Sequence, residues 1–395
     1  MSKGMNNDRL KRYNRGLVFQ LLSTGTATSR VELAHKSKLS KMTLSYIISE
    51  FIELGYVEER ANVALPTRGN PMQLRLAKTA PKIIGVYICR ACCQAAVCDF
   101  SMNIIDVASC DLPDPVDNDS LIQCLYSITD PLIQKHNDVM GISIGSIGPV
   151  DIQNGIVLEP LNFGKVRYFP VKALFEERYR LPVCFEYHYN CSALTEELFG
   201  NGKGYQNLLY VGLPNVANIN YASGVGMGVV CGGQLYSSFT GYSSEIGHVA
   251  INSFDGPLCP CGNRGCLGVY ANIPNIMRDV AELPGQKLMS FQEICQNSNT
   301  PGIDRVLMEN LLHPLIYALT NTITLLNPEL ILLGDIASEL PSRYLGYIEQ
   351  RLNERIFARN SRRVIVKHAK FPPEYNAAMC ASAVIDKVFH GEYLF

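Results

Sequence analysis

Three cysteines and a histidine in one short stretch constrain the fold more than any other feature of this sequence. The segment reads Cys259-Pro-Cys261-Gly-Asn-Arg-Gly-Cys266, and His248 precedes it by eleven residues. Three thiolates and one imidazole complete the tetrahedral ligand set of zinc, and the two glycines let the backbone turn tightly around an ion. The alternative is a chance grouping of buried thiols. We expect a structural Zn2+ site within 248–266, with no open position for hydrolytic chemistry.

The composition indicates a folded protein of more than one domain. The chain has 395 residues, of which 47% are apolar and 18% charged. Its 14 cysteines otherwise scatter through apolar runs, which is typical of buried thiols in a reducing compartment. No apolar stretch is long enough to span a bilayer, and the polar N-terminus does not resemble a secretory signal. We therefore expect a cytoplasmic protein with no membrane contact.

The first 54 residues contain three short helical patterns. The first pattern carries one apolar face, formed by Leu17, Val18, Leu21 and Leu22. The spacing of Ser29 and Glu32 predicts a capping box at the start of a second helix, and Ser40 is placed to cap a third. The third pattern ends at Gly55. Two short helices joined by a tight turn, behind a supporting helix, are typical of a helix-turn-helix.

A predicted hairpin follows the third helix. Residues 56–59 and 72–76 alternate like strands, and the segment 65–71 between them is rich in turn-forming residues. Helix-turn-helix and hairpin together predict a winged helix-turn-helix over residues 1–78, followed by a larger domain over 79–395.

The charge of the predicted winged domain favours DNA as its partner. Residues 1–78 carry a net charge of +7, whereas the remaining chain carries −8. The third helix would enter the major groove, and Arg68 in the wing would enter the minor groove. The residues expected to contact DNA on that helix are Lys41, Met42, Thr43, Ser45 and Tyr46. The alternative is a helical module that binds another protein.

From residue 79 onward, short apolar strands alternate with helices, which predicts an α/β fold. The candidate strands are 83–88, 94–99, 141–144, 208–212, 224–230 and 330–333. The candidate helices are 119–135, 171–179, 190–199 and 304–326.

Taken together, these motifs resemble the ROK family of sugar kinases and repressors. The resemblance rests on the helix-turn-helix, on Glu245-Ile-Gly-His248 and on the cysteine motif, and it covers roughly residues 10–390. It is strongest with the branch of xylose and N-acetylglucosamine repressors. The resemblance implies an actin-like, hexokinase-type pair of α/β lobes, with a sugar in the cleft between them.

The kinase positions of this family are altered here. Family kinases carry an Asp-Ile-Gly-Gly-Thr type phosphate loop, where this chain reads Gly85-Val-Tyr87-Ile-Cys89-Arg90-Ala91. His188 stands at the place of the catalytic aspartate. Because phosphoryl transfer depends on holding and neutralising the phosphates, we expect no kinase activity and no catalytic residue.

The resemblance also marks candidate effector-binding residues. These are Glu245, His248, Asn190, Tyr187 and His188. Glu245 and His248 stand where the family contacts sugar hydroxyls, whereas a further family glutamate is replaced by Gly268. Tyr187 and His188 would supply replacement hydrogen bonds and a stacking surface. The alternative is that they fill an abandoned pocket.

The sequence therefore predicts a DNA-binding transcription regulator, a repressor of carbohydrate-utilisation genes that responds to a sugar or sugar derivative. A palindromic operator implies a homodimer or homotetramer. Activation of transcription is left open by the sequence. Two other functions stay open: an active sugar kinase with an accessory DNA-binding head, and a regulator controlled by a protein partner instead of a sugar.

Overall fold

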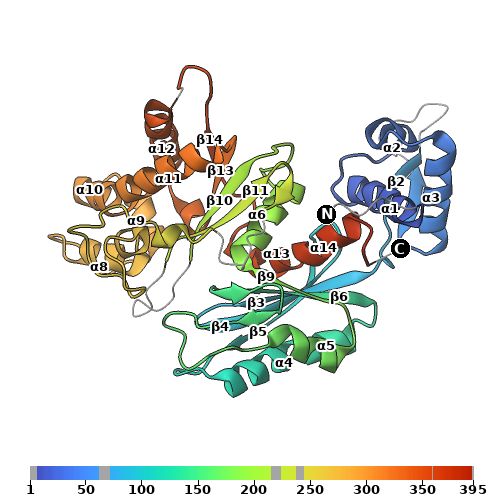
Figure 1. Ribbon diagram of the computed structural model, residues 1–395, viewed down its shortest axis with the longest axis horizontal. Helices are drawn as coiled ribbons and strands as arrows, with labels where there is room; N and C mark the ends of the chain where they lie inside the picture. Colours follow the sequence, from blue (N-terminus) through green and yellow to red (C-terminus); the bar gives the residue numbers. More distant parts are fainter. Residues whose placement is uncertain (1–6, 62–71, 215–223, 237–243, 358, 394–395) are drawn as a thin grey trace.

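The computed structural model describes residues 7–61, 72–214, 224–236, 244–357 and 359–393. Within these ranges no helix is both long and apolar enough to cross a bilayer. The chain forms a small N-terminal unit and two larger α/β units, and the last two helices lie between them (Figure 1).

The N-terminal unit consists of three helices and a two-stranded antiparallel hairpin. These elements are called the head below: α1 (Asn7–Ser23), α2 (Arg30–Ser37), α3 (Lys41–Glu53), β1 (Val57–Ala61) and β2 (Met72–Leu76). The predicted capping box of Ser29 and Glu32 is confirmed, and the Ser40 side chain caps α3. Gly55 follows α3 with a φ of +71°, a conformation that favours glycine. The predicted wing segment 65–71 lies outside the described residues.

One face of α3 forms the core of the head. Leu44, Ile47, Ile48 and Phe51 are buried on that face and pack with Phe19 of α1. An ion pair between Arg15 and Glu50, 2.9 Å apart, ties the same two helices.

The first lobe is built on a five-stranded sheet in the order β5-β4-β3-β6-β9. Its strands are β3 (Lys82–Ile88), β4 (Cys92–Cys98), β5 (Ile104–Asp111), β6 (Val139–Ser146) and β9 (Val183–Tyr187). Figure 1 shows α4 (Asn118–Lys135) and α5 (Val171–Tyr179) covering one face of this sheet. A separate two-stranded hairpin is formed by β7 (Val150–Asp151) and β8 (Ile156–Val157).

The second lobe is built on a sheet in the order β12-β11-β10-β13-β14. Its strands are β10 (Leu208–Leu213), β11 (Gly226–Cys231), β12 (Gln234–Leu235), β13 (Leu330–Asp335) and β14 (Ile365–His368). The helices of this lobe are α7 (Leu267–Tyr270), α8 (Ile273–Ala281), α9 (Phe291–Gln296), α10 (Pro301–Leu307), α11 (His313–Leu326) and α12 (Ser342–Arg355). The helix expected over 304–326 is interrupted by a π-helical turn at Met308–Leu312.

The two sheets share one topology. In each, the first strand pairs antiparallel with the second and parallel with the fourth, and a fifth strand extends the parallel side. Helix α6 (His188–Phe199) begins at the end of β9 and packs against β10 and β11 of the other sheet. The expected pair of actin-like lobes is confirmed.

The last two helices, α13 (Asn376–Cys380) and α14 (Ser382–Phe389), approach the rest of the chain at glycines. A Cβ added to Gly85 of β3 would lie 1.9 Å from the carbonyl oxygen of Ala377. A Cβ added to Gly16 of α1 would lie 2.2 Å from the carbonyl oxygen of Phe389. Only glycine permits these approaches, so α1 docks directly on the end of α14 (Figure 1).

This docking predicts the effect of Gly16→Ala. The added methyl group would meet backbone that cannot rotate away, and such overpacking costs roughly 1–3 kcal/mol. We expect a lower melting temperature and faster proteolysis within the head, measured by calorimetry and limited digestion.

Gly346→Ala is the matched control, because Gly346 lies in α12 with nothing within 4 Å of an added Cβ. There the better helix propensity of alanine should stabilise the protein by up to about 1 kcal/mol. Equal stability of the two variants would contradict the tight docking of α1.

Candidate functional site

A cleft of about 940 Å³ opens between the two lobes. Tyr87 and Arg90 line it from the first lobe, and Gly226 and Glu245 line it from the second. His248 and the cysteine motif border the same cleft. The site and the metal cluster are therefore neighbours.

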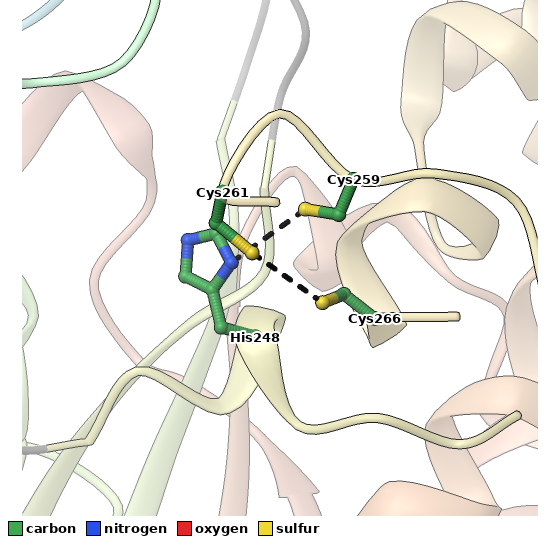
Figure 2. A group of neighbouring side chains, drawn as sticks. All are labelled: His248, Cys259, Cys261 and Cys266. Carbon is green, nitrogen blue, oxygen red and sulfur yellow. Dashed lines mark hydrogen bonds between the residues drawn. The ribbon is translucent and has the colours of Figure 1, made fainter. Parts of the chain in front are cut away.

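The four predicted metal ligands lie together (Figure 2). The donor atoms of His248, Cys259, Cys261 and Cys266 all lie within 4.8 Å of one another. Cys259 Sγ is 3.7 Å from His248 Nδ1, and Cys261 Sγ is 3.7 Å from Cys266 Sγ. In a tetrahedral site with Zn–S bonds of about 2.3 Å, sulfur atoms are about 3.8 Å apart. The cluster fits zinc in donor type and spacing.

Local backbone structure positions these ligands. His248 ends the short helix η1 (Ile246–His248), and Cys266 lies directly before α7. Between them a tight turn returns the chain, with the amide of Cys259 bonded to the carbonyl of Asn263 at 2.7 Å. Gly265 has a φ of +66°, and a Cβ there would lie 1.9 Å from the carbonyl oxygen of Asn252. The glycine is therefore required for the turn to close.

The protonation of the cluster also suits a metal. Burial lowers the pKa of His248, which favours the neutral imidazole that binds zinc. A backbone hydrogen bond from Asn263 lowers the pKa of the Cys261 thiol. Metal binding needs the deprotonated forms of both residue types.

Glu245 and Tyr187 face one spot in the cleft. A Cβ added to Gly148 would lie 2.8 Å from Glu245 Oε1 and 3.4 Å from the Tyr187 ring. Burial raises the pKa of Glu245, and the charge of Arg90 acts in the opposite direction. A half-buried carboxylate beside a tyrosine ring offers an acceptor for sugar hydroxyls and an apolar surface for the ring of a sugar.

His188 lines the same cleft within a cluster of aromatic rings. Its ring centroid lies 3.9 Å from that of Tyr189, 5.0 Å from that of Tyr187 and 5.4 Å from that of Tyr87. Its Nδ1 is 3.1 Å from the carbonyl oxygen of Ser146. Burial lowers the pKa of His188 to about 4, so the ring is neutral at neutral pH.

Asn190 is not brought to the cleft. Its side chain is buried, and its amide donates a hydrogen bond to Glu186 Oε1 at 2.9 Å. Its position two residues after His188 on α6 turns it away from Tyr187 and Glu245.

Several cleft residues were not predicted as ligands from the sequence. Arg90 lines the cleft, and its guanidinium donates to the carbonyl of Leu161 of the same lobe. Tyr189 packs against the glycines of β10 and β11, since a Cβ on Gly212 or Gly226 would lie 2.0 or 1.8 Å from its ring. The sequence signal was present for Arg90: a charged residue stands in an otherwise apolar hairpin.

On the head, the predicted DNA-contacting residues lie on the solvent side of α3. Met42 is 83% exposed and Tyr46 65% exposed. Lys41 and Ser45 are exposed as well, while the Thr43 hydroxyl lies 2.9 Å from that of Ser40. Arg68 lies outside the described residues.

Two matching sheets around a cleft define a two-lobed, actin-like α/β protein. Residues 83–387 match the model of the ROK family, so the chain belongs to the ROK family. The xylose repressor of Caldicellulosiruptor bescii is 23% identical over 408 residues, which cover 98% of this chain and 99% of that repressor.

Two further comparisons extend over the head. The DNA-binding transcriptional repressor Mlc of Escherichia coli is 24% identical over 402 residues, covering 98% of this chain and 96% of Mlc. A crystal structure of a ROK family transcriptional regulator, described as a homologue of the E. coli Mlc protein, matches with a TM-score of 0.78 at 24% identity. That match covers 97% of this chain and 98% of the regulator.

The metal cluster predicts that Cys261→Ser removes zinc. Serine is a poor zinc ligand, so the metal content should fall from about one zinc per chain towards zero, and the second lobe should melt earlier. Metal analysis and calorimetry measure both effects.

Cys231→Ser is the control, because Cys231 is also exposed and lies outside the cluster. Its zinc content and melting temperature should not change. Full zinc retention by the Cys261 variant would remove Cys261 from the ligand set.

Proposed function

We propose that this protein is a DNA-binding transcriptional repressor of carbohydrate-utilisation genes, that it responds to a sugar or sugar derivative and that it has no kinase activity. In this proposal residues 1–78 are a winged helix-turn-helix domain, and residues 79–395 bind the effector and form the oligomer. The protein acts in the cytoplasm as a homodimer or homotetramer on a palindromic operator.

The exposed face of α3 carries the proposal. Met42 and Tyr46 are both exposed there, on the side of α3 opposite the buried face that forms the core of the head. Lys41 at the start of the same helix supplies a positive charge for phosphate, and the hydroxyl of Ser45 suits base or backbone contacts. The net charge of +7 over residues 1–78 agrees with DNA as the partner.

Repression is supported by the relatives, since both curated proteins named above are repressors that match over the head as well as the lobes. The name of the C. bescii relative points to a sugar as the effector. The cleft supports this assignment, because the Glu245 carboxylate and the Tyr187 ring approach one spot of a large, partly apolar pocket.

The loss of kinase activity is supported by what occupies the cleft. In ROK kinases the nucleotide lies on glycine-rich turns, but here the ring of Tyr189 fills the space beside Gly212 and Gly226. At the position of the catalytic base, His188 has a pKa of about 4, which makes it a weak base at neutral pH.

Zinc, in this proposal, has a structural role. The four protein ligands leave no open coordination position, and the bound ion would hold the segment between Glu245 and α7 in one conformation. An effector that touches Glu245 would then act on a rigid loop. Effector binding would change the closure of the lobes and so the spacing of paired heads on DNA.

The DNA assignment predicts a weaker, less salt-dependent complex for Lys41→Ala. A lost phosphate contact lowers the slope of log K against log salt by about 0.9. The measurement is fluorescence anisotropy at several salt concentrations, with an operator selected from a random DNA library.

Lys287→Ala is the charge-matched control, since Lys287 is exposed in the second lobe. It should keep the affinity and the slope of the unaltered protein. Identical slopes for all three proteins would exclude Lys41 from the DNA contact.

The effector assignment is tested by a thermal-shift screen of sugars, amino sugars and their phosphates. A ligand at ~100 times its dissociation constant should stabilise the protein by roughly 2.7 kcal/mol. For the sugar found, Glu245→Gln should weaken binding about tenfold or more, because a hydrogen bond to a charged group contributes roughly 1.5–3 kcal/mol. Calorimetric titration measures the change.

Glu282→Gln, at an exposed glutamate after α8, is the control and should bind the sugar normally. Sugar-dependent release of ADP from ATP would contradict the loss of kinase activity. A blank screen together with DNA release by a protein from cell extract would instead favour control by a protein partner.

A further inference from the structure

Two cysteines face each other across the tip of the hairpin that joins β3 to β4. Ile88 pairs with Cys93, and the next pair along the ladder is Cys89 and Cys92, with the amide of Cys89 3.1 Å from the carbonyl oxygen of Cys92. Their sulfur atoms are 3.1 Å apart. A disulfide bond is about 2.05 Å long, so the two sulfurs need to move together by only about 1 Å.

The hairpin tip lies in the cleft. Cys89, Arg90 and Ala91 all line it, and Cys89 and Cys92 are both half-buried. Small solutes that enter the cleft therefore reach Cys89. By contrast, Cys93 and Cys98 on the same strand are fully buried, as are Cys191 and Cys380 beneath the sheet.

We propose that Cys89 and Cys92 form a reversible disulfide in the wall of the cleft, and that this oxidation changes the affinity of the cleft for its effector. The second half of this inference rests on the proposed function; the first half does not.

The surroundings divide the two thiols into an attacking and a resolving group. Hydrogen bonds from Cys92, first from its thiol and then from its amide at 3.3 Å, lower the pKa of Cys89, and nearby Arg90 acts in the same direction. The hydrogen bond between the two thiols and burial both raise the pKa of Cys92. Cys89 therefore loses its proton more readily than Cys92, and the thiolate is the reactive form of cysteine.

The oxidant is a small-molecule disulfide. The Cys89 thiolate attacks one of its sulfurs, forms a mixed disulfide and releases one small thiolate. Cys92 then loses its proton, and its sulfur attacks the sulfur of Cys89 and displaces the second small thiolate. Two protein thiols are oxidised to one disulfide, and the small disulfide is reduced to two thiols.

Arg90 connects this bond to the effector site. It stands between the two cysteines, its guanidinium donates to the carbonyl of Leu161, and its charge acts on Glu245. The disulfide would restrain the turn that carries Arg90 and would remove the Cys89 thiol from the cleft wall. Both changes alter groups that a bound ligand meets.

The first experiment detects the bond in the full-length protein, using oxidised glutathione as the probe. Trypsin cleaves after Lys82 and after Arg90, so it separates Cys89 from Cys92. After oxidation and alkylation of the remaining thiols, peptide 83–90 should stay joined to peptide 91–135, and a reductant should release it. Absence of this linked pair overturns the inference.

Matched variants identify the partner within the second peptide. Cys92→Ser should abolish the linkage, whereas Cys93→Ser and Cys124→Ser should retain it, with unchanged zinc content in all three. A linkage that survives Cys92→Ser overturns the assignment of Cys92.

The second experiment compares reduced and oxidised protein in their affinity for the sugar found by thermal shift. We expect a difference of about tenfold, equivalent to ~1.4 kcal/mol, that is absent from Cys89→Ser. Equal affinities with a fully formed disulfide overturn the regulatory half alone. If no sugar binds although the linkage forms, the regulatory half and the proposed effector function both fail, while the assignment of the dithiol stands.

Discussion

The close contact of the last two helices with glycine backbone holds the three parts of the molecule together. Helix α13 lies on Gly85 and on Gly145, where a Cβ would be 2.3 Å from the sulfur of Cys380. Helix α13 accepts one hydrogen bond from Thr195 of α6, and Ser382 of α14 donates one to a backbone carbonyl of α6. Because α6 also packs on the second sheet, a movement of one lobe relative to the other would also displace the helices on which the head is docked. The contact therefore offers a mechanical path from cleft to head.

The cleft keeps the frame of a sugar kinase but fills it differently. The rings of Tyr87, His188 and Tyr189 cluster in its wall, and the charge of Arg90 acts on the carboxylate of Glu245. The ring of Tyr189 packs against Gly212 of β10 and Gly226 of β11.

The sequence predicted the local structure correctly where the interacting residues are close along the chain. The capping box of Ser29 and Glu32 and the four metal ligands span short distances, so their spacing fixes their geometry. The side-chain direction of Asn190 was not predictable in this way, because it depends on how α6 is rotated between two sheets. The docking of Gly16 could not be predicted either, because its partner, Phe389, is far away in the sequence.

The contact between the first and last helices also sets an order of events during synthesis. Helix α1 leaves the ribosome well before α14, the helix on whose backbone it docks. Until then Phe19, which packs against Phe389 as well as within the head, lacks one of its partners. A nascent chain thus carries a head that is not yet fixed to the lobes. The orientation of the head relative to the lobes is therefore set only after α14 has been synthesised and has folded.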